Sequence, residues 1–204
     1  MVVTEIQELS KSRSKIVLDQ EFAFVLYKGE LRHYRVQVGA EFPEEDFREI
    51  MTEVLPKRAK LRAMNLLKSR SYTTARLRLK LQQGGYPEEV IREALEYVAS
   101  FHYTDDLRYA VDFITDNDQR KSRIRIEQDL RAKGISAEII EQAWREWQEN
   151  GGSQDEAAMI EALLQKKKYD PEKADTKEQQ KVYAFLMRKG FSGEKITRAM
   201  RKDF

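Results

Sequence analysis

The chain contains no cysteine and only two histidines among its 204 residues. The absence of cysteine excludes disulfide bonds, thiolate zinc or iron–sulfur sites, and thiol catalysis. The histidines, His33 and His102, lie in different regions, and neither has a serine and a carboxylate arranged around it, which argues against a catalytic triad or a zinc site. We therefore expect a protein that is not an enzyme and that holds no cofactor and no metal.

Long apolar runs and nucleotide-binding motifs are also missing. No stretch approaches the roughly 18 apolar residues of a membrane span, and residues 1–15 lack the apolar core of a signal peptide. Neither common glycine-rich phosphate loop is present. The net charge of +2 gives no global reason to expect binding to nucleic acid or membranes. We expect a cytoplasmic protein without a membrane partner.

A six-residue phrase, Leu-x-x-x-Gly followed by an aromatic residue or isoleucine, occurs three times, at 81–86, 130–135 and 186–191. The offsets of 49 and 56 residues indicate one helical supersecondary unit copied in tandem. Each glycine is expected to adopt the left-handed conformation that ends a helix, with the next residue packed against the last turn. These structural glycines are Gly85, Gly134 and Gly190.

The repeats predict a mainly α protein, a solenoid-like tandem array of three three-helix repeats. The expected helices span 57–70, 73–84, 87–100, 104–117, 120–133, 136–149, 154–168, 176–189 and 192–203. Residues 74–81 alternate apolar and polar side chains, which alone would predict a strand. The aligned segment 182–186 does not alternate, so the repeat favours a helix there.

The amino-terminal segment has a different pattern. Residues 16–18 and 22–27 are rich in β-branched and aromatic side chains, and Lys28-Gly29 can supply a turn, so we expect a small β-meander of two or three strands. Helical periodicity begins after Pro43, and Pro56 should kink or split that helix. The expected domains are 1–42 for the meander, 43–102 for the first repeat with its preceding helix, 103–150 for the second repeat and 151–204 for the third.

The segment 54–87 contains no acidic residue. A solvated helix face normally mixes both signs, so a block of one sign predicts an anionic partner. The alternative is neutralisation within the fold by the acidic stretches 41–53 and 88–96, which flank the block. Its nine cationic residues are Lys57, Arg58, Lys60, Arg62, Lys68, Arg70, Arg76, Arg78 and Lys80.

Two other basic groups are weaker indications. In the second repeat Glu127 and Asp129 are interspersed among the cations, so a functional and a structural interpretation are both open. The cations of this group are Arg120, Lys121, Arg123, Arg125, Arg131 and Lys133. Lys166–Lys168 stands at an expected helix end, where we expect a favourable interaction with the helix dipole and with solvent.

Residues 103–110 open the second repeat with the sequence Tyr-Thr-Asp-Asp-Leu-Arg-Tyr-Ala. Threonine is a good helix cap, and acidic residues favour the positive end of a helix. Adjacent carboxylates on one helix point about 100° apart, which does not favour a metal site. We therefore expect a structural role for Asp105, Asp106, Arg108 and Tyr109.

Several of these segments together resemble the bacterial RecX family, regulators of the RecA recombinase. The segments that carry the resemblance are 67–73, 81–86, 103–110, 121–126 and 185–192. The resemblance covers about residues 57–204. The amino-terminal β-like segment and the connection 166–175 resemble the family least.

The resemblance implies an elongated, curved array that lies in the helical groove of a RecA–DNA filament and acts as a negative regulator. We expect a monomer that is not an enzyme. It implies inhibition of filament growth, ATP hydrolysis, strand exchange and coprotease activity. The residues expected to contact the filament, its single- or double-stranded DNA, or both are Lys68, Arg70, Arg76, Arg78, Lys80, Arg120, Lys121, Arg123, Arg125 and Lys133. The alternatives are a helical protein that binds DNA or RNA without a recombinase, and a scaffold for protein partners only.

Overall fold

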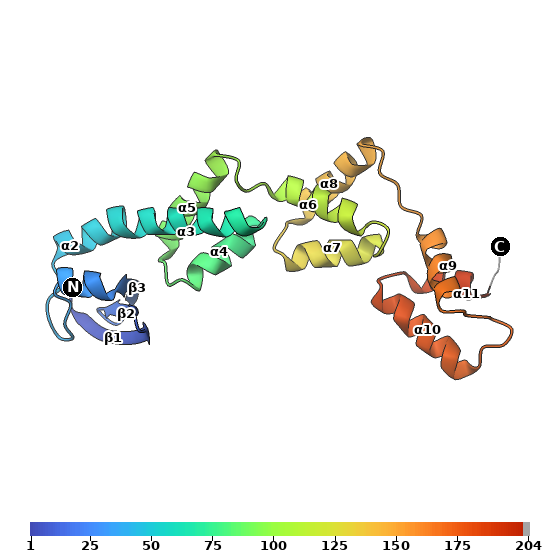
Figure 1. Cartoon of the computed structure of the whole chain (residues 1–204), viewed down its shortest axis with the longest axis horizontal. Helices are drawn as coiled ribbons and strands as arrows, with labels where there is room; N and C mark the ends of the chain where they lie inside the picture. The colour runs from blue at the N-terminus through green and yellow to red at the C-terminus, as the bar shows by residue number, and fades with distance from the viewer. Residues whose placement is uncertain (202–204) are drawn as a thin grey trace. The chain divides into compact units, whose positions relative to one another are not determined.

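The computed structural model describes residues 1–201, and its elements are labelled in Figure 1. The chain divides into two compact units, one up to Asp105 and one from Asp106 onward. The first unit contains β1 (Val3–Ser10), β2 (Arg13–Leu18), β3 (Phe22–Tyr27), α1 (Lys28–His33), α2 (Glu44–Glu49), the π-helix η1 (Ile50–Val54), α3 (Leu55–Ser69), α4 (Thr74–Gln82) and α5 (Glu88–Ser100). The second contains α6 (Asp106–Asn117), α7 (Arg123–Ala132), α8 (Ala137–Glu149), α9 (Glu156–Lys166), α10 (Thr176–Arg188) and α11 (Gly193–Arg201). The predicted fold class, mainly α with three three-helix repeats and a small β segment, is confirmed.

The three strands form an antiparallel meander in the order β1-β2-β3. The turn predicted at Lys28-Gly29 is wrong, because Lys28 begins α1. A carboxylate oxygen of Glu30 accepts the backbone N–H of Tyr27 at 2.7 Å. An acidic side chain that reaches back in this way satisfies a backbone donor at the start of a helix, so the chain enters a helix and not a further strand.

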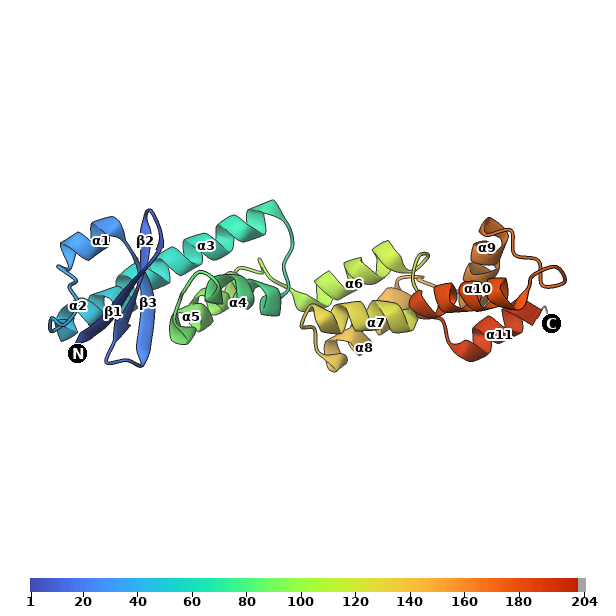
Figure 2. The same cartoon turned by 90° about the horizontal axis from the view of Figure 1, so that it is seen from below.

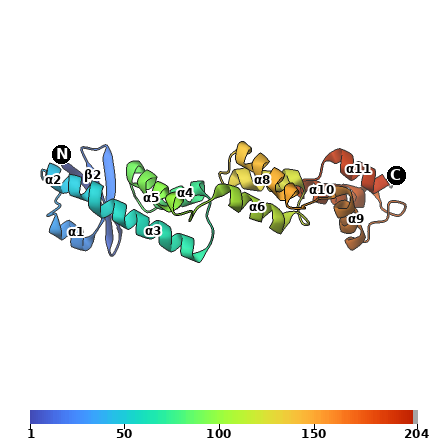
Figure 3. The same ribbon diagram turned by 90° about the horizontal axis from the view of Figure 1, so that it is seen from above.

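The sheet and the first repeat share one hydrophobic core. Ile16 of β2, Phe24 of β3, Leu55 of α3, Leu77 of α4 and Ile91 of α5 are all buried in it. The long helical segment formed by α2, η1 and α3 runs across the sheet, as Figures 2 and 3 show from opposite sides. The β segment is therefore an integral part of the first unit.

Pro56 lies inside this long helical segment, which continues through it. Proline lacks the N–H of the helix ladder, and its ring crowds the carbonyl four residues earlier, here that of Thr52. The π-helical turn Ile50–Val54 directly precedes α3 and contains Thr52. The predicted disturbance at Pro56 thus takes the form of a π-helical turn and not of a break.

The three glycines of the repeated phrase have φ angles of 80°, 84° and 89°, the left-handed conformation predicted for Gly85, Gly134 and Gly190. In each repeat the N–H of the following residue donates to the carbonyl of the leucine five positions earlier, at 3.4, 3.2 and 3.3 Å. This bond satisfies a carbonyl at the helix end. Burial raises the pKa of Tyr86, the residue that follows Gly85 and packs on the core.

The segment with the strand-like alternation is helix α4, as the repeat predicts. Leu77 and Leu81 are buried on one side of it, whereas Leu79 is 40% exposed on the other. The Thr73 hydroxyl accepts the N–H of Arg76 at 3.2 Å and caps the first turn. The period-two pattern is therefore a helix that buries two of its three leucines.

The second and third repeats have separate hydrophobic cores. The core of the second contains Ile126 and Leu130 with both tryptophans of the chain, Trp144 and Trp147. The core of the third is built around Leu186 and its neighbours in α9 and α11. Within residues 1–201, no helix has the length and apolar character that crossing a membrane requires, and no three acidic, histidine or cysteine side chains come together as a metal site.

Candidate partner-binding surface

The cations predicted in the first repeat lie on α3, on α4 and on the turn between them. Lys68 is in the last turn of α3, and Arg70 follows it with its guanidinium 4.7 Å from the centre of the Tyr72 ring. Arg76 is exposed on α4, and Lys80 donates to the side chain of Gln83 at 3.4 Å. The first repeat thus brings these cations onto the ends and outer side of one helix pair.

Acidic residues neutralise part of the single-sign block. Arg58 pairs with Glu30 and also donates to the carbonyl of Val25 at 3.1 Å. Lys60 pairs with Glu93 at 2.6 Å. Arg78 pairs with Glu88, so one of the predicted contact residues already has an acidic partner. Neutralisation by the flanking stretch 88–96 and a surplus of positive charge are therefore both present.

The remaining cations of the block keep their charge uncompensated. In the part of the chain that the structure describes, no carboxylate lies within ion-pair distance of Lys57, Arg62, Lys68, Arg70 or Lys80. Arg76 has an interaction of its own and is not among them. The surplus charge of the first repeat is thus concentrated on α3, on the turn at Arg70 and on Lys80.

In the second repeat, two acidic residues of α7 form ion pairs with most of the basic group. Glu127 and Asp129 have side chains only 21% and 20% exposed, and each binds two cations. The pairs are Arg123 and Arg131 with Glu127, at 2.9 and 3.3 Å, and Lys121 and Arg125 with Asp129, at 2.9 and 3.2 Å. Of the other two predicted residues, Arg120 is exposed before α7, and the Lys133 ammonium lies 5.2 Å from the Phe113 ring centre.

The residues expected to be structural lie at helix ends. Asp106 opens α6, directly after Asp105, and Arg108 is in its first turn. Tyr109 stacks on Phe113, one turn later, with ring centres 6.4 Å apart and an interplanar angle of 10°. These positions are those of a helix start and a packing contact.

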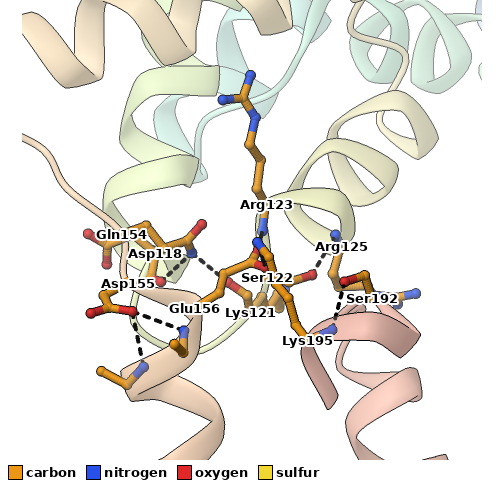
Figure 4. A network of polar contacts seen from close by, with 12 residues as sticks. Asp118, Lys121, Ser122, Arg123, Arg125, Gln154, Asp155, Glu156, Ser192 and Lys195 are labelled. Atoms are coloured by element: carbon orange, nitrogen blue, oxygen red, sulfur yellow. Dashed lines mark hydrogen bonds and ion pairs between the residues drawn. The ribbon is translucent and has the colours of Figure 1, made fainter. Parts of the chain in front are cut away.

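A polar joint that was not predicted connects the second repeat to the third (Figure 4). One carboxylate oxygen of Glu156, at the start of α9, accepts the N–H of Arg123, the first residue of α7, at 2.9 Å. The other oxygen binds the Lys195 ammonium of α11 at 2.9 Å. The Gln154 side chain donates to the carbonyls of Asp118 and Lys121 at 2.5 and 2.8 Å. Glu156 thus satisfies a backbone donor of one repeat and a charge of the next.

The sequence contains no signal for this joint. Glu156 lies in the first turn of α9, where an acidic side chain interacts favourably with the positive end of its own helix. This local interaction is enough to account for the residue in the sequence. That Glu156 reaches α7 depends on how α9 and α7 pack, which no local pattern encodes.

Replacing Glu156 with alanine should loosen the joint. The side chain is 11% exposed, so its removal leaves the Arg123 N–H and the Lys195 charge without their acceptor at a cost of about 1–3 kcal/mol. Amide hydrogen exchange should become faster in the first turn of α7 and in α11. The matched control is Glu141→Ala, which removes the ion pair between Glu141 and Arg145. The Glu141 side chain is 69% exposed, so this substitution should cost less than about 0.5 kcal/mol. Equal protection in the two variants would contradict a role for Glu156.

Family models match all three repeats. They describe the first, second and third three-helix domains of RecX and match residues 59–97, 105–143 and 154–200. The regulatory protein RecX of Trichlorobacter lovleyi is 33% identical over 151 residues, which cover 72% of this chain and 96% of that protein. The regulatory protein RecX of Caldanaerobacter subterraneus subsp. tengcongensis is 29% identical over 202 residues, 98% of each chain.

Solved structures with the same architecture carry the same name. A crystal structure of regulatory protein RecX matches with a TM-score of 0.61 and 26% identity, covering 100% of this chain and 99% of that one. The crystal structure of RecX from Lactobacillus salivarius matches with a TM-score of 0.54 at 22% identity, over 73% of this chain and 96% of that one, which is a likeness of fold.

Proposed function

This chain belongs to the RecX family of regulatory proteins, and we propose from that membership that it is a non-enzymatic negative regulator of a RecA-type recombinase. It binds in the groove of the recombinase–DNA filament and inhibits filament growth, ATP hydrolysis, strand exchange and coprotease activity. The observation that carries the proposal is the match of all three repeats, in order, to the three domains of the family.

The first repeat has features that suit a protein partner. Lys68, Arg70 and Lys80 carry positive charge without an acidic partner in residues 1–201, and Leu79 exposes an apolar side chain on the same helix as Lys80. An apolar centre with charged surroundings is typical of protein interfaces, and complementary charge raises the association rate. These residues are the contact surface that we propose for the recombinase.

The proposal is tested by titrating the full chain into a recombinase–DNA ATPase assay. We expect inhibition at stoichiometric protein. The variant Lys68→Glu, Arg70→Glu, Lys80→Glu should need about tenfold more protein or more, because like charges then face the partner. Arg78 is left intact, since its reversal would set two carboxylates against each other at Glu88.

The matched control reverses three exposed cations of the same unit, Lys11, Arg32 and Arg92, and should inhibit like the unmodified chain. Absence of inhibition by the unmodified chain would overturn the proposal. Binding to bare DNA or RNA with a steep salt dependence but no effect on the recombinase would favour the alternative of a nucleic-acid-binding protein. Partner binding that is insensitive to salt and to charge reversal would favour a scaffold.

A further inference from the structure

The third repeat carries a cluster of cations around Phe185 of α10 that was not predicted from the sequence. The ammonium of Lys167, which follows α9, lies 4.2 Å from the centre of the Phe185 ring, and that of Lys189 lies 5.8 Å from it. Phe185 is half-buried beneath them. Phe185 and neighbouring side chains line a shallow hollow of about 470 Å³, which we call the cationic hollow. Its lining residues are Lys167, Lys177, Gln180, Lys181, Ala184, Phe185 and Arg188.

The charges of the cationic hollow are uncompensated. Four of its seven lining residues are basic and none is acidic. Within residues 1–201, no carboxylate pairs with any of the four or with Lys189. This differs from α7, where two acidic residues bind four cations.

The acidic residues near the start of α10 are engaged elsewhere. The side chain of Asp175 accepts the N–H of Glu178 at 2.7 Å and caps the helix. The negative charge of Glu178 lies near Tyr169. The pKa of Tyr169 is raised mainly by burial and to a smaller extent by this charge. Tyr169 lines other hollows of the repeat and is not part of the cationic hollow. Within residues 1–201, neither carboxylate forms an ion pair with a cation of the hollow.

The cations of α10 form a row along the helix. At 1.5 Å per residue, Lys181 lies about 6 Å along the axis from Lys177, and Arg188 about 10 Å further. All three side chains are exposed. Lys167, directly after α9, adds a fourth charge beside this row, held over an aromatic face by a cation–π contact. A row of this kind offers several contacts to a polyanion and few to a single compact anion.

We propose that the cationic hollow binds the phosphate backbone of nucleic acid without reading its bases. The cores of protein interfaces are depleted of lysine, whereas contacts to phosphate come mainly from lysine and arginine. Gln180 is the only uncharged polar side chain of the hollow, so its polar groups are almost all cationic and suit phosphate charge, which every nucleotide carries whatever its base. This site lies in a different repeat from the surface proposed for the recombinase and does not depend on it.

The test uses the full chain and bare nucleic acid, with no recombinase present. Binding of a labelled single strand and of a labelled duplex is measured by fluorescence anisotropy over a series of salt concentrations. The variant Lys177→Gln, Lys181→Gln, Arg188→Gln should bind at least roughly tenfold more weakly near 0.1 M salt. The slope of log K against log salt should become shallower by about 2 for the single strand and about 3 for the duplex, because three phosphate contacts are lost.

The matched control is Lys11→Gln, Arg32→Gln, Arg92→Gln, which removes the same charge from exposed positions in the first unit. It should leave affinity and slope close to those of the unmodified chain. Equal losses in both variants, or no binding by the unmodified chain at low salt, would overturn the proposal. A separate recombinase ATPase assay gives a third outcome that would overturn the proposal. If the α10 variant binds nucleic acid normally but no longer inhibits the recombinase, the hollow contacts protein. All three substituted side chains are exposed, and circular dichroism verifies that the variant is folded.

Discussion

Replacing Gly190 with alanine should lower the free energy of unfolding of the third repeat by about 2–4 kcal/mol. Its φ of 89° is strained for any residue with a Cβ. A Cβ at this position would also lie 2.5 Å from Oγ of Ser122 and 2.6 Å from Cβ of Arg125, both on or beside α7. Either the helix end or the contact with the second repeat must then shift.

Hydrogen exchange of the α10 and α11 amides in the full chain measures this effect, and the urea midpoint of the third repeat gives a second estimate. Gly151→Ala is the matched control, since Gly151 has a φ of 86° but nothing within 4 Å of the added Cβ. That variant should lose about 1 kcal/mol, the cost of backbone strain alone. If the two substitutions cost the same, the close contact between Gly190 and α7 has no energetic weight.

Leu130→Ala should destabilise the second repeat by about 2–5 kcal/mol, since it removes a fully buried side chain and leaves a cavity. Leu130 is 0% exposed and packs in the same core as Ile126, Trp144 and Trp147. These are the only tryptophans of the chain, so urea unfolding followed by their fluorescence reports on this repeat.

Ile124→Ala is the control on the same helix. Ile124 is 48% exposed, so its truncation should cost less than about 1 kcal/mol. A similar loss in both variants would mean that the core of the second repeat does not depend on the leucine of the repeated phrase.

The repeated phrase predicted the helical architecture correctly because its cause is local. A leucine in the last helical turn, a left-handed glycine and an apolar residue form one bonded motif within six residues, and the same hydrogen bond is present in all three copies. Alignment of the copies also corrected the strand-like pattern of α4, where Leu79 faces away from the core. The β-meander was predicted from β-branched and aromatic content, but α1 was missed, since its start depends on the single backward bond of Glu30.

The candidate surfaces were harder to predict. In the first repeat the sequence showed a block of nine cations, and the fold pairs Arg58, Lys60 and Arg78 with carboxylates. In the third repeat, Glu178 and several neutral residues separate Lys177, Lys181 and Arg188, and further acidic residues precede them, so no block is visible. Their spacing of four and seven residues on one helix is the signal that could have indicated a common face.

The sequence by itself determined the number of repeats, the ends of their middle helices and the family, because these rest on bonds and spacings between residues close along the chain. The tertiary structure alone decided which charges remain available. Arg58 meets Glu30 from 28 positions away, and Lys195 meets Glu156 from 39 positions away. Ion pairing depends on proximity in space, which the packing of helices creates, so only the folded chain shows which cations of the first and third repeats keep an uncompensated charge.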